Sequence, residues 1–294
     1  MIGINKRSAG EVAFDWLNVI LMLVICLITL YPVWYVVVNS LNDGQDAISG
    51  GIFWWPRVLS FENYKVVLRD EGILQAFWIS IAKTGLGTFV HVFFTSMVAY
   101  ALSKNGLVGR KLYMIIGTIT LFFHGGLIPT YLLIRNLGLL DHFLVYILPF
   151  MFSFYNLILF LAFFREIPEG LEEAATIDGA NDLGIFLRII LPVSLPVLAT
   201  IALFTGVQQW NDYFTGVIYV NNSSLVPIQT VLYRVVTGDG ANEMMLNTAG
   251  LELQVTPQSV KLATMVVATL PIVLIYPFLQ RYFVKGLMIG SLKG

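Results

Sequence analysis

Six long apolar runs constrain the fold of this chain more strongly than any other feature of its sequence. They extend over about residues 14–40, 74–102, 112–134, 143–164, 193–220 and 260–284. Each is long enough to cross about 30 Å of hydrocarbon as a helix, which takes roughly 20 residues. In lipid a spanning segment must satisfy its own backbone hydrogen bonds, which favours helices. The sequence therefore predicts an all-α membrane protein with six transmembrane helices.

The composition also indicates that membrane lipid surrounds the protein. Only 12% of the residues are charged and 57% are hydrophobic, whereas a soluble domain has about 25% charged residues. The net charge is −1 and no basic run occurs, so the charge pattern gives no indication of nucleic-acid binding. We expect membrane lipid, rather than water, around most of the surface.

The first apolar run has one feature of a signal peptide, because Lys6 and Arg7 precede it. Its apolar part, about residues 17–38, is long enough to span a bilayer. Asn39 and Ser40 then lead into a polar segment without a small-residue cleavage pattern. We therefore expect a retained helix rather than a cleaved signal.

The positions of Lys and Arg predict the orientation. With a cytoplasmic N-terminus, ten basic residues fall in cytoplasmic segments and six in outer segments, and Lys83 lies within a span. Basic residues are enriched on the cytoplasmic side, so both termini are predicted to be cytoplasmic. We expect one transmembrane domain over residues 1–294.

Two outer segments are too short to form domains of their own. Residues 41–72 contain Phe53-Trp54-Trp55-Pro56, which suits an aromatic belt at the outer membrane interface. Residues 221–259 contain an apolar stretch at 225–236 and then a Gly/Asn-rich tip at Gly238, Gly240 and Asn242. The stretch is too short to span, so it predicts a small helix or re-entrant piece.

A distinctive segment at 165–192 lies between the fourth and fifth runs. Pro168 suits the first position of a helix, and Gly179 can end that helix in a left-handed conformation. Asn181 is a good N-cap for a second helix. The negative charges near the positive end of the first helix come from Glu169, Glu172 and Glu173.

One face of this first helix carries small residues. By helical spacing it consists of Leu171, Ala174, Ala175 and Asp178. Two alanines let the backbone of another protein come close, so the face suits docking of a soluble partner. The alternative is an ordinary amphipathic connector that lies on the membrane.

The same segment resembles the EAA loop of permease subunits in ATP-binding-cassette importers. The family pattern is Glu-Ala-Ala, three residues, Gly, nine residues, Ile, one residue and Leu-Pro, and it is matched here by Glu173, Ala174, Ala175, Gly179, Ile189, Leu191 and Pro192. The extension Ile177-Asp178-Gly179-Ala180 is similar to the carbohydrate-uptake, maltose-permease-like branch. So is Phe123-His-Gly-Gly-Leu-Ile-Pro-Thr-Tyr-Leu-Leu, followed by Leu137-Gly-Leu.

This resemblance implies a bacterial cytoplasmic membrane protein with the type I importer permease fold. In the family the loop is a coupling helix that sits in a cleft of an ATPase subunit. Glu173 would then make a polar contact there, Ala174 and Ala175 would pack in the cleft, and Gly179 would form the bend. The implied partners are a second, homologous permease subunit, two ATPase subunits and an extracytoplasmic solute-binding protein that delivers a sugar.

Catalytic, metal and cofactor signals are missing from the sequence. No Gly-x-x-x-x-Gly-Lys-Ser/Thr phosphate loop occurs, so ATP and Mg²⁺ are expected on the partner ATPase subunits. His91, His124 and His142 are not spaced as metal ligands, and we expect packing or interfacial roles for them. Cys26 is the one cysteine, and we expect it to pack.

Polar residues inside the runs are candidates for the transport pathway, because lipid disfavours them. They are Lys83 in the second run and Gln208, Gln209, Trp210, Asn211, Asp212 and Tyr213 in the fifth. Amides, a carboxylate and aromatic rings are groups that bind sugars. We expect Lys83 to pair with Asp212. The alternative is that these residues pair with one another or with a second permease subunit.

Other functions stay open at this point. A polyamine, a peptide or an ion could replace the sugar as cargo. A secondary transporter would favour inverted repeats and broken helices in matching halves, and a membrane-embedded enzyme would need more titratable groups in the spans. The resemblance leans towards larger oligosaccharides, including acidic ones, and Lys83 would suit a uronate carboxylate if it lined the pathway.

Overall fold

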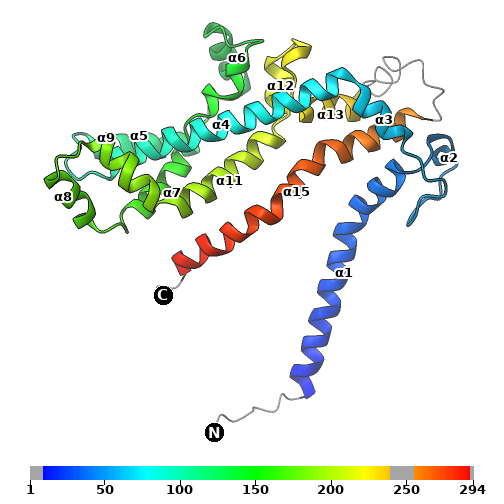
Figure 1. Cartoon of the computed structure of the whole chain (residues 1–294), viewed down its shortest axis with the longest axis horizontal. Helices are drawn as coiled ribbons and strands as arrows, with labels where there is room; N and C mark the ends of the chain where they lie inside the picture. Colours follow the sequence, from blue (N-terminus) through cyan, green and yellow to red (C-terminus); the bar gives the residue numbers. More distant parts are fainter. Residues whose placement is uncertain (1–8, 239–254, 292–294) are drawn as a thin grey trace. The chain divides into compact units, whose positions relative to one another are not determined.

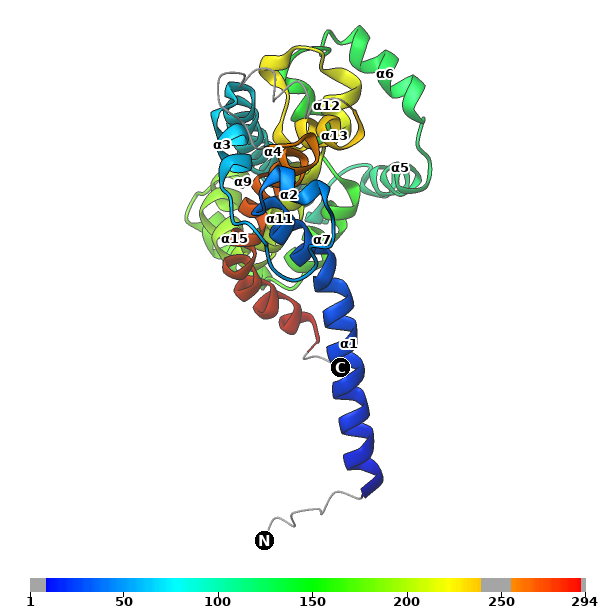
Figure 2. The same cartoon turned by 90° about the vertical axis from the view of Figure 1, so that its right-hand side faces the viewer.

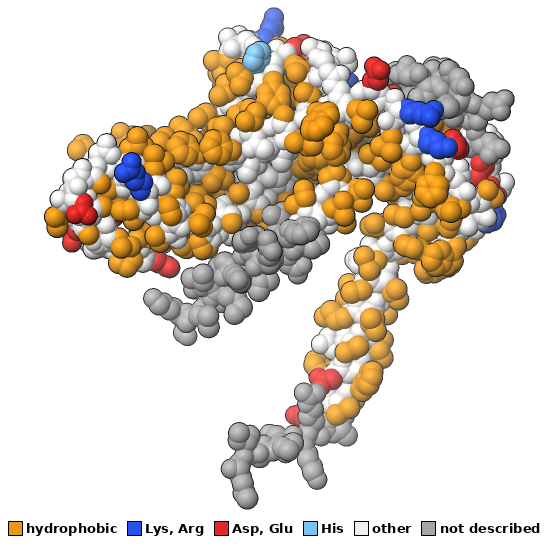
Figure 3. All heavy atoms as spheres, in the orientation of Figure 1, with side chains coloured by type: hydrophobic (Ala, Val, Ile, Leu, Met, Phe, Trp, Pro, Cys, Tyr) orange, Lys and Arg blue, Asp and Glu red, His pale blue; other side chains and the backbone are white. Residues whose placement is uncertain are grey.

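The computed structural model describes residues 9–238 and 255–291, and within them the chain is helical, with a single β-bridge between Asn42 and Leu59. Two compact units are formed. Unit 1 comprises Met1–Asp70 and Gly238–Val267, and unit 2 comprises Glu71–Thr237 and Ala268–Gly294. In a space-filling view the long flanks of both units are mostly hydrophobic, and charged side chains lie towards their ends (Figure 3).

Unit 1 contains the long helix α1 (Ala9–Ser40) and the short helices α2 (Gly44–Ile48) and α3 (Glu62–Arg69). Two tryptophans of the predicted aromatic belt lie against α1. The indole of Trp34 donates to the carbonyl of Trp54 at 3.0 Å, and the rings of Trp34 and Trp55 meet edge to face with centroids 5.5 Å apart. Trp54 and Trp55 remain exposed, as an interfacial position requires.

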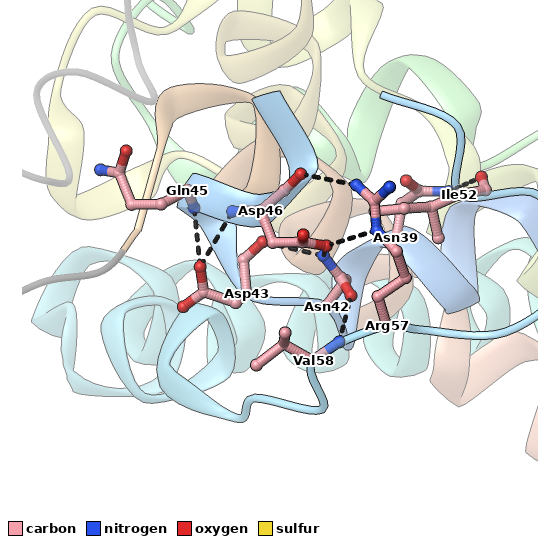
Figure 4. Close-up of polar contacts among 8 residues, drawn as sticks. All are labelled: Asn39, Asn42, Asp43, Gln45, Asp46, Ile52, Arg57 and Val58. Carbon is pink, nitrogen blue, oxygen red and sulfur yellow. Dashed lines mark hydrogen bonds and ion pairs between the residues drawn. The ribbon is translucent and has the colours of Figure 1, made fainter. Parts of the chain in front are cut away.

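A network of polar side chains organises the segment after α1 (Figure 4). Asp46 accepts hydrogen bonds from Asn42 and Arg57 at 2.9 and 3.0 Å, and these two bonds lower the pKa of its carboxyl. The amide oxygen of Asn42 accepts from the backbone of Val58. Asp43 caps α2 by accepting from the N–H groups of Gln45 and Asp46. The segment after α1 is therefore folded rather than a loose connection.

Unit 2 is built around α4 (Glu71–Ser103). Helices α7 (Phe154–Phe164) and α11 (Leu195–Asn211) pack along it (Figure 1). At the end that carries α8 and α9, a core of buried aromatic and aliphatic side chains joins these helices, and it includes Tyr100, Leu157, Phe160, Phe186, Ile190 and Ile201.

Three of the six runs form single long helices within the described residues: α1, α4 and α15 (Pro257–Ser291). The remaining runs are not continuous helices, contrary to the simplest expectation. Residues 112–134 form α5 (Arg110–Phe122) and α6 (Leu127–Asn136), and the chain bends by 119° between them. Figure 2 shows this sharp turn. Gly126 permits it by adopting φ +84°.

The fourth and fifth runs are also interrupted. The 3₁₀ turns η1 (Phe143–Tyr146) and η2 (Leu148–Phe150) precede α7 at an angle of 50°. The helical stretch Asp182–Val193 precedes α11, and the chain bends by 81° between the two. The stretch consists of α9 (Asp182–Ile185), the π-helix η3 (Phe186–Ile190) and α10 (Leu191–Val193). After α11 the chain breaks at Asp212 and continues as α12 (Phe214–Tyr219).

A short helix forms where the sequence predicts a small helix or re-entrant piece at 225–236. After the 3₁₀ turn η4 (Ser223–Leu225), helix α13 (Ile228–Thr237) begins where the N–H of Ile228 donates to Ser80 Oγ on α4 at 2.8 Å. Thr230 Oγ1 donates to the carbonyl of Tyr213 at 2.9 Å. Most of the predicted Gly/Asn-rich tip, including Gly240 and Asn242, lies outside the described residues.

Candidate functional sites: a coupling helix and a polar cavity

The predicted docking helix exists as α8 (Glu169–Ile177). It ends in the expected way, with Gly179 at φ +81°. The N–H of Gly179 donates to the carbonyl of Thr176, and the N–H of Ala180 to that of Ala175, which is the Schellman pattern. Pro168 is the N-cap and not the first helical residue, so the expected helix start is wrong by one position.

The helix after Gly179 also begins as predicted. Asn181 Oδ1 accepts the N–H of Gly184 at 2.8 Å and so caps α9. Together these two ends orient α8 and α9 as separate short helices with a tight turn between them. The EAA segment is thus a preformed helix–turn–helix.

The two alanines of the motif differ in their surroundings. Ala174 is exposed, whereas Ala175 is only 8% exposed and belongs to the core that contains Ile185 and Phe186. Only Ala174 therefore offers a small surface to another protein, and Ala175 anchors α8 to its own chain. Leu171, Glu173, Thr176, Ile177 and Asp178 are exposed as well.

The C-terminal end of the motif packs mainly against the core of unit 2 and contributes little to the exposed surface of α8. Ile189 and Leu191 are partly buried and pack against the same core, while Pro192 is exposed in the first turn of α10. Ile189 lies in the π-helix η3, a rare form that is frequent at functional sites. The motif thus divides into an exposed part near Gly179 and a packed part near Leu191.

A polar cavity of about 1070 Å³ opens in unit 2 between α4, α5, α7 and α11. Four of the seven predicted pathway residues line it: Gln208, Gln209, Asn211 and Asp212. Further lining residues that the sequence did not single out as pathway residues are His91, His124, Phe150, Tyr155, Asn156 and Phe204. Amides and aromatic rings therefore dominate the wall.

His91 connects two walls of this cavity. Its Nδ1 lies 2.6 Å from the carbonyl oxygen of Phe150, and its Nε2 lies 2.8 Å from Asn156 Nδ2. A carbonyl only accepts, so Nδ1 carries the proton, and Nε2 accepts from the amide. His91 therefore joins two walls of the cavity by hydrogen bonds, beyond the packing or interfacial role expected for it. The hydrogen bond to His91 uses the Nδ2 of Asn156 and does not involve its amide oxygen.

Lys83 and Asp212 form the ion pair that the sequence predicts. Lys83 Nζ is 3.2 Å from Asp212 Oδ2 and 2.8 Å from the Asp212 carbonyl oxygen, and it lies 4.9 Å from the centroid of the Tyr146 ring. Asp212 also accepts the N–H of Thr215 at 3.1 Å. The ammonium stands at the C-terminal end of α11, where a helix favours positive charge. The pair fixes the break between α11 and α12.

Lys83, Trp210 and Tyr213 do not line the cavity. Lys83 has no exposed surface, so the condition for a contact with a uronate is not met in this conformation. The indole of Trp210 donates to the Ala268 carbonyl at 3.3 Å. The Tyr213 ring stacks on that of Tyr233, with centroids 4.8 Å apart. These three residues hold the structure together beside the cavity.

Gln209 shows how closely α4 and α11 approach. Its Nε2 donates to the Tyr146 carbonyl at 3.2 Å. A Cβ added to Gly87 of α4 would lie 3.0 Å from the same nitrogen, so the glycine leaves the space that Gln209 needs. Gln209 Oε1 is buried without a partner among the described residues. The amide is therefore positioned by the helices rather than free to rotate.

Comparison with known proteins agrees with this geometry. Residues 72–289 match the family described as binding-protein-dependent transport system inner membrane component. The chain belongs to this family. It is therefore a permease subunit of an ATP-binding-cassette importer and not an enzyme.

Individual relatives cover nearly the whole permease. It is 39% identical to the polygalacturonan/rhamnogalacturonan transport system permease protein YtcP of Bacillus subtilis (strain 168), over 96% of this chain and 98% of that protein. It is 40% identical to Protein LplC of the same organism, over 99% and 98%. A solved bacterial ABC transporter involved in the import of the acidic polysaccharide alginate has a chain that superposes with a TM-score of 0.87, at 30% identity, covering 95% of the permease and 99% of that chain.

We expect Lys83 and Asp212 to be energetically coupled. Lys83→Met should lower the free energy of unfolding by about 3–5 kcal/mol, because it leaves a partly buried carboxylate without its partner. Asp212→Asn should also destabilise, and the double variant should cost less than the sum by more than about 1 kcal/mol. Unfolding of the purified permease in detergent measures this. Gln208→Ala, on the same helix but exposed, is the control and should change little. Additive effects would exclude a coupled pair.

Proposed function

We propose that this permease forms half of a translocation pathway for oligosaccharides in the bacterial cytoplasmic membrane. A homologous second permease subunit completes the pathway, two ATPase subunits drive it, and an extracytoplasmic binding protein delivers the cargo. The observation that carries the proposal is the helix α8, which exposes part of the EAA motif on the protein surface and belongs to the same unit as the polar cavity.

The proposed ATPase contact is the exposed part of the EAA segment. Glu173 offers a carboxylate, Ala174 a small surface and Ile177 a large apolar one, with 86% of its surface exposed. Asp178 and Gly179 form the turn beside them. Ile189 and Leu191 pack against the core behind this surface, whereas Pro192 is exposed in the first turn of α10. Ala175 also packs against this core, instead of entering the ATPase cleft as expected. ATP and Mg²⁺ bind to the partner subunits, since the permease has no phosphate loop.

The proposed orientation follows from this contact. ATP is used in the cytoplasm, so α8 faces the cytoplasm. Six crossings result if each bent pair counts as one span, and both termini are then cytoplasmic. The excess of basic residues in the segments assigned to that side supports this arrangement.

The proposed cargo is an oligosaccharide, in keeping with the amides and rings of the cavity. Gln208 and Asn211 are exposed there and suit sugar hydroxyls, and Phe204 and Tyr155 suit the apolar face of a sugar ring. Within the described part of the chain the cavity is lined by no Lys or Arg, and its one carboxylate, Asp212, is paired with Lys83. A uronate would thus meet neither attraction nor repulsion here. We assign the choice of acidic cargo, which the relatives' names favour, to the binding protein.

Docking is tested by co-purification. The tagged permease, expressed with its neighbouring genes and extracted in mild detergent, should bring down an ATPase subunit and a second permease subunit. Gly179→Trp should lose the ATPase, because the left-handed backbone disfavours a side chain and the indole would cover the docking surface. Gly138→Trp is the matched control, since Gly138 is also left-handed with open space around its Cα. It should retain the ATPase. A wild-type permease that purifies alone would contradict the proposal.

Cargo is tested with the complex in liposomes. Binding protein loaded with oligogalacturonides should stimulate ATP hydrolysis, and unloaded binding protein should not. Gln208→Leu should lower uptake of the cargo about fivefold or more, because it removes one hydrogen bond of about 1 kcal/mol or more from the cavity wall. Tyr213→Phe lies outside the cavity and should leave uptake unchanged. Equal uptake by both variants would remove the cavity from the pathway.

A further inference from the structure

A side-chain joint outside the EAA motif ties α8 to the end of α4. Lys104 directly follows α4, and its ammonium donates to Glu172 of α8. The same ammonium lies 4.3 Å from the centroid of the Tyr100 ring on α4, within the range of a cation–π interaction. We call Tyr100, Lys104 and Glu172 the α4–α8 joint.

The joint is shielded more than an ordinary surface pair. The side chains of Lys104 and Glu172 are 32% and 29% exposed, compared with 53% and 35% for the pair Lys65–Glu62 in α3. Burial is the largest single influence and lowers the pKa of Lys104, but the hydrogen bonds and charge interactions with Glu172 and Tyr100 together outweigh it, so the pKa is raised. Shielding from water strengthens the attraction between the two charges.

Packing reinforces the joint on the same side of α8. Ala175 is three residues after Glu172 and therefore lies on the same helical face, where it is buried in the core. That core includes Phe186, whose ring stacks on Tyr100 with centroids 5.4 Å apart. If α8 moved and the end of α4 did not, the Lys104–Glu172 ion pair and the packing of Ala175 would both be broken.

Helix α4 continues from this joint to the cavity. Lys83 lies about 30 Å along the helix axis from Lys104, at 1.5 Å per residue. There Lys83 forms an ion pair with the Asp212 carboxylate and donates a hydrogen bond to the Asp212 carbonyl, at the break between α11 and α12. The same helix is therefore held at one end by the proposed coupling helix and near its middle by the cavity wall.

We propose that Lys104, Glu172 and Tyr100 are positioning residues that couple α8 to α4. Through them a displacement of α8 moves α4, and α4 moves the α11–α12 break beside the cavity. The inference rests on the proposed function, because it requires an ATPase subunit to displace α8. The alternative is that Glu172 contacts the ATPase subunit directly. In that case a change of Lys104 would have no effect on coupling.

Charge reversal tests the joint in the complete complex. Lys104→Glu and Glu172→Lys should each leave the ATPase bound but lower the cargo taken up per ATP hydrolysed by about fivefold or more, the lower range of coupling between sites. The double reversal K104E/E172K restores the ion pair and should bring the ratio back to within about twofold of the wild type. Lys104→Met, which keeps the length of the side chain, should lower the ratio as well and serves if a reversal fails to fold.

The control is the same reversal in another pair. E62K/K65E in α3 exchanges an exposed pair remote in sequence from α8 and should leave the ratio unchanged. An unchanged ratio in the single variants, or no recovery in an assembled double variant, overturns the inference alone. Absence of the ATPase from the wild-type complex overturns the proposed function and this inference with it.

Discussion

The fold of unit 2 depends on one buried charge, the ammonium of Lys83. A charge without exposed surface is costly in a protein and more so within a membrane, so the chain must supply acceptors for it. Asp212 supplies both its carboxylate and its main-chain carbonyl, and it can do so only because α11 ends there. The requirement to neutralise Lys83 thus joins α4 to the break in the fifth apolar run. That break in turn sets the positions of Gln208, Gln209 and Asn211 around the cavity.

A second interaction holds the same helix at its C-terminal end. Lys104 and Glu172 join α4 to α8, and Ala175 packs behind them. The two ion pairs have different environments, because Lys83 is fully buried and Lys104 is a third exposed. A rigid helix between two held points transmits displacement, whereas a flexible loop would absorb it. In our account α4 is therefore the element through which the coupling helix acts on the cavity.

Sequence patterns predict the parts of this structure that depend on local chemistry. The long helices α1, α4 and α15 enclose the apolar runs at 14–40, 74–102 and 260–284, and the caps at Gly179 and Asn181 follow from residue type. Hydropathy does not predict the break at Gly126, because the segments on both sides of it are apolar, and the polar residues up to Asp212 do not by themselves indicate that α11 ends there. Burial of Ala175 was missed as well, since helical spacing defines a face but not what covers it. The pairing of Lys104 with Glu172 joins residues far apart in the sequence, and neither charge alone indicates it.

ATP, and not an ion gradient, drives transport through this permease in the mechanism proposed above. The most direct test measures oligogalacturonide uptake into liposomes that contain the complete complex and external binding protein. Our account predicts uptake only with hydrolysable ATP on the side of α8, and no change when ionophores collapse every ion gradient. Uptake that continues without ATP and follows an ion gradient would contradict the account.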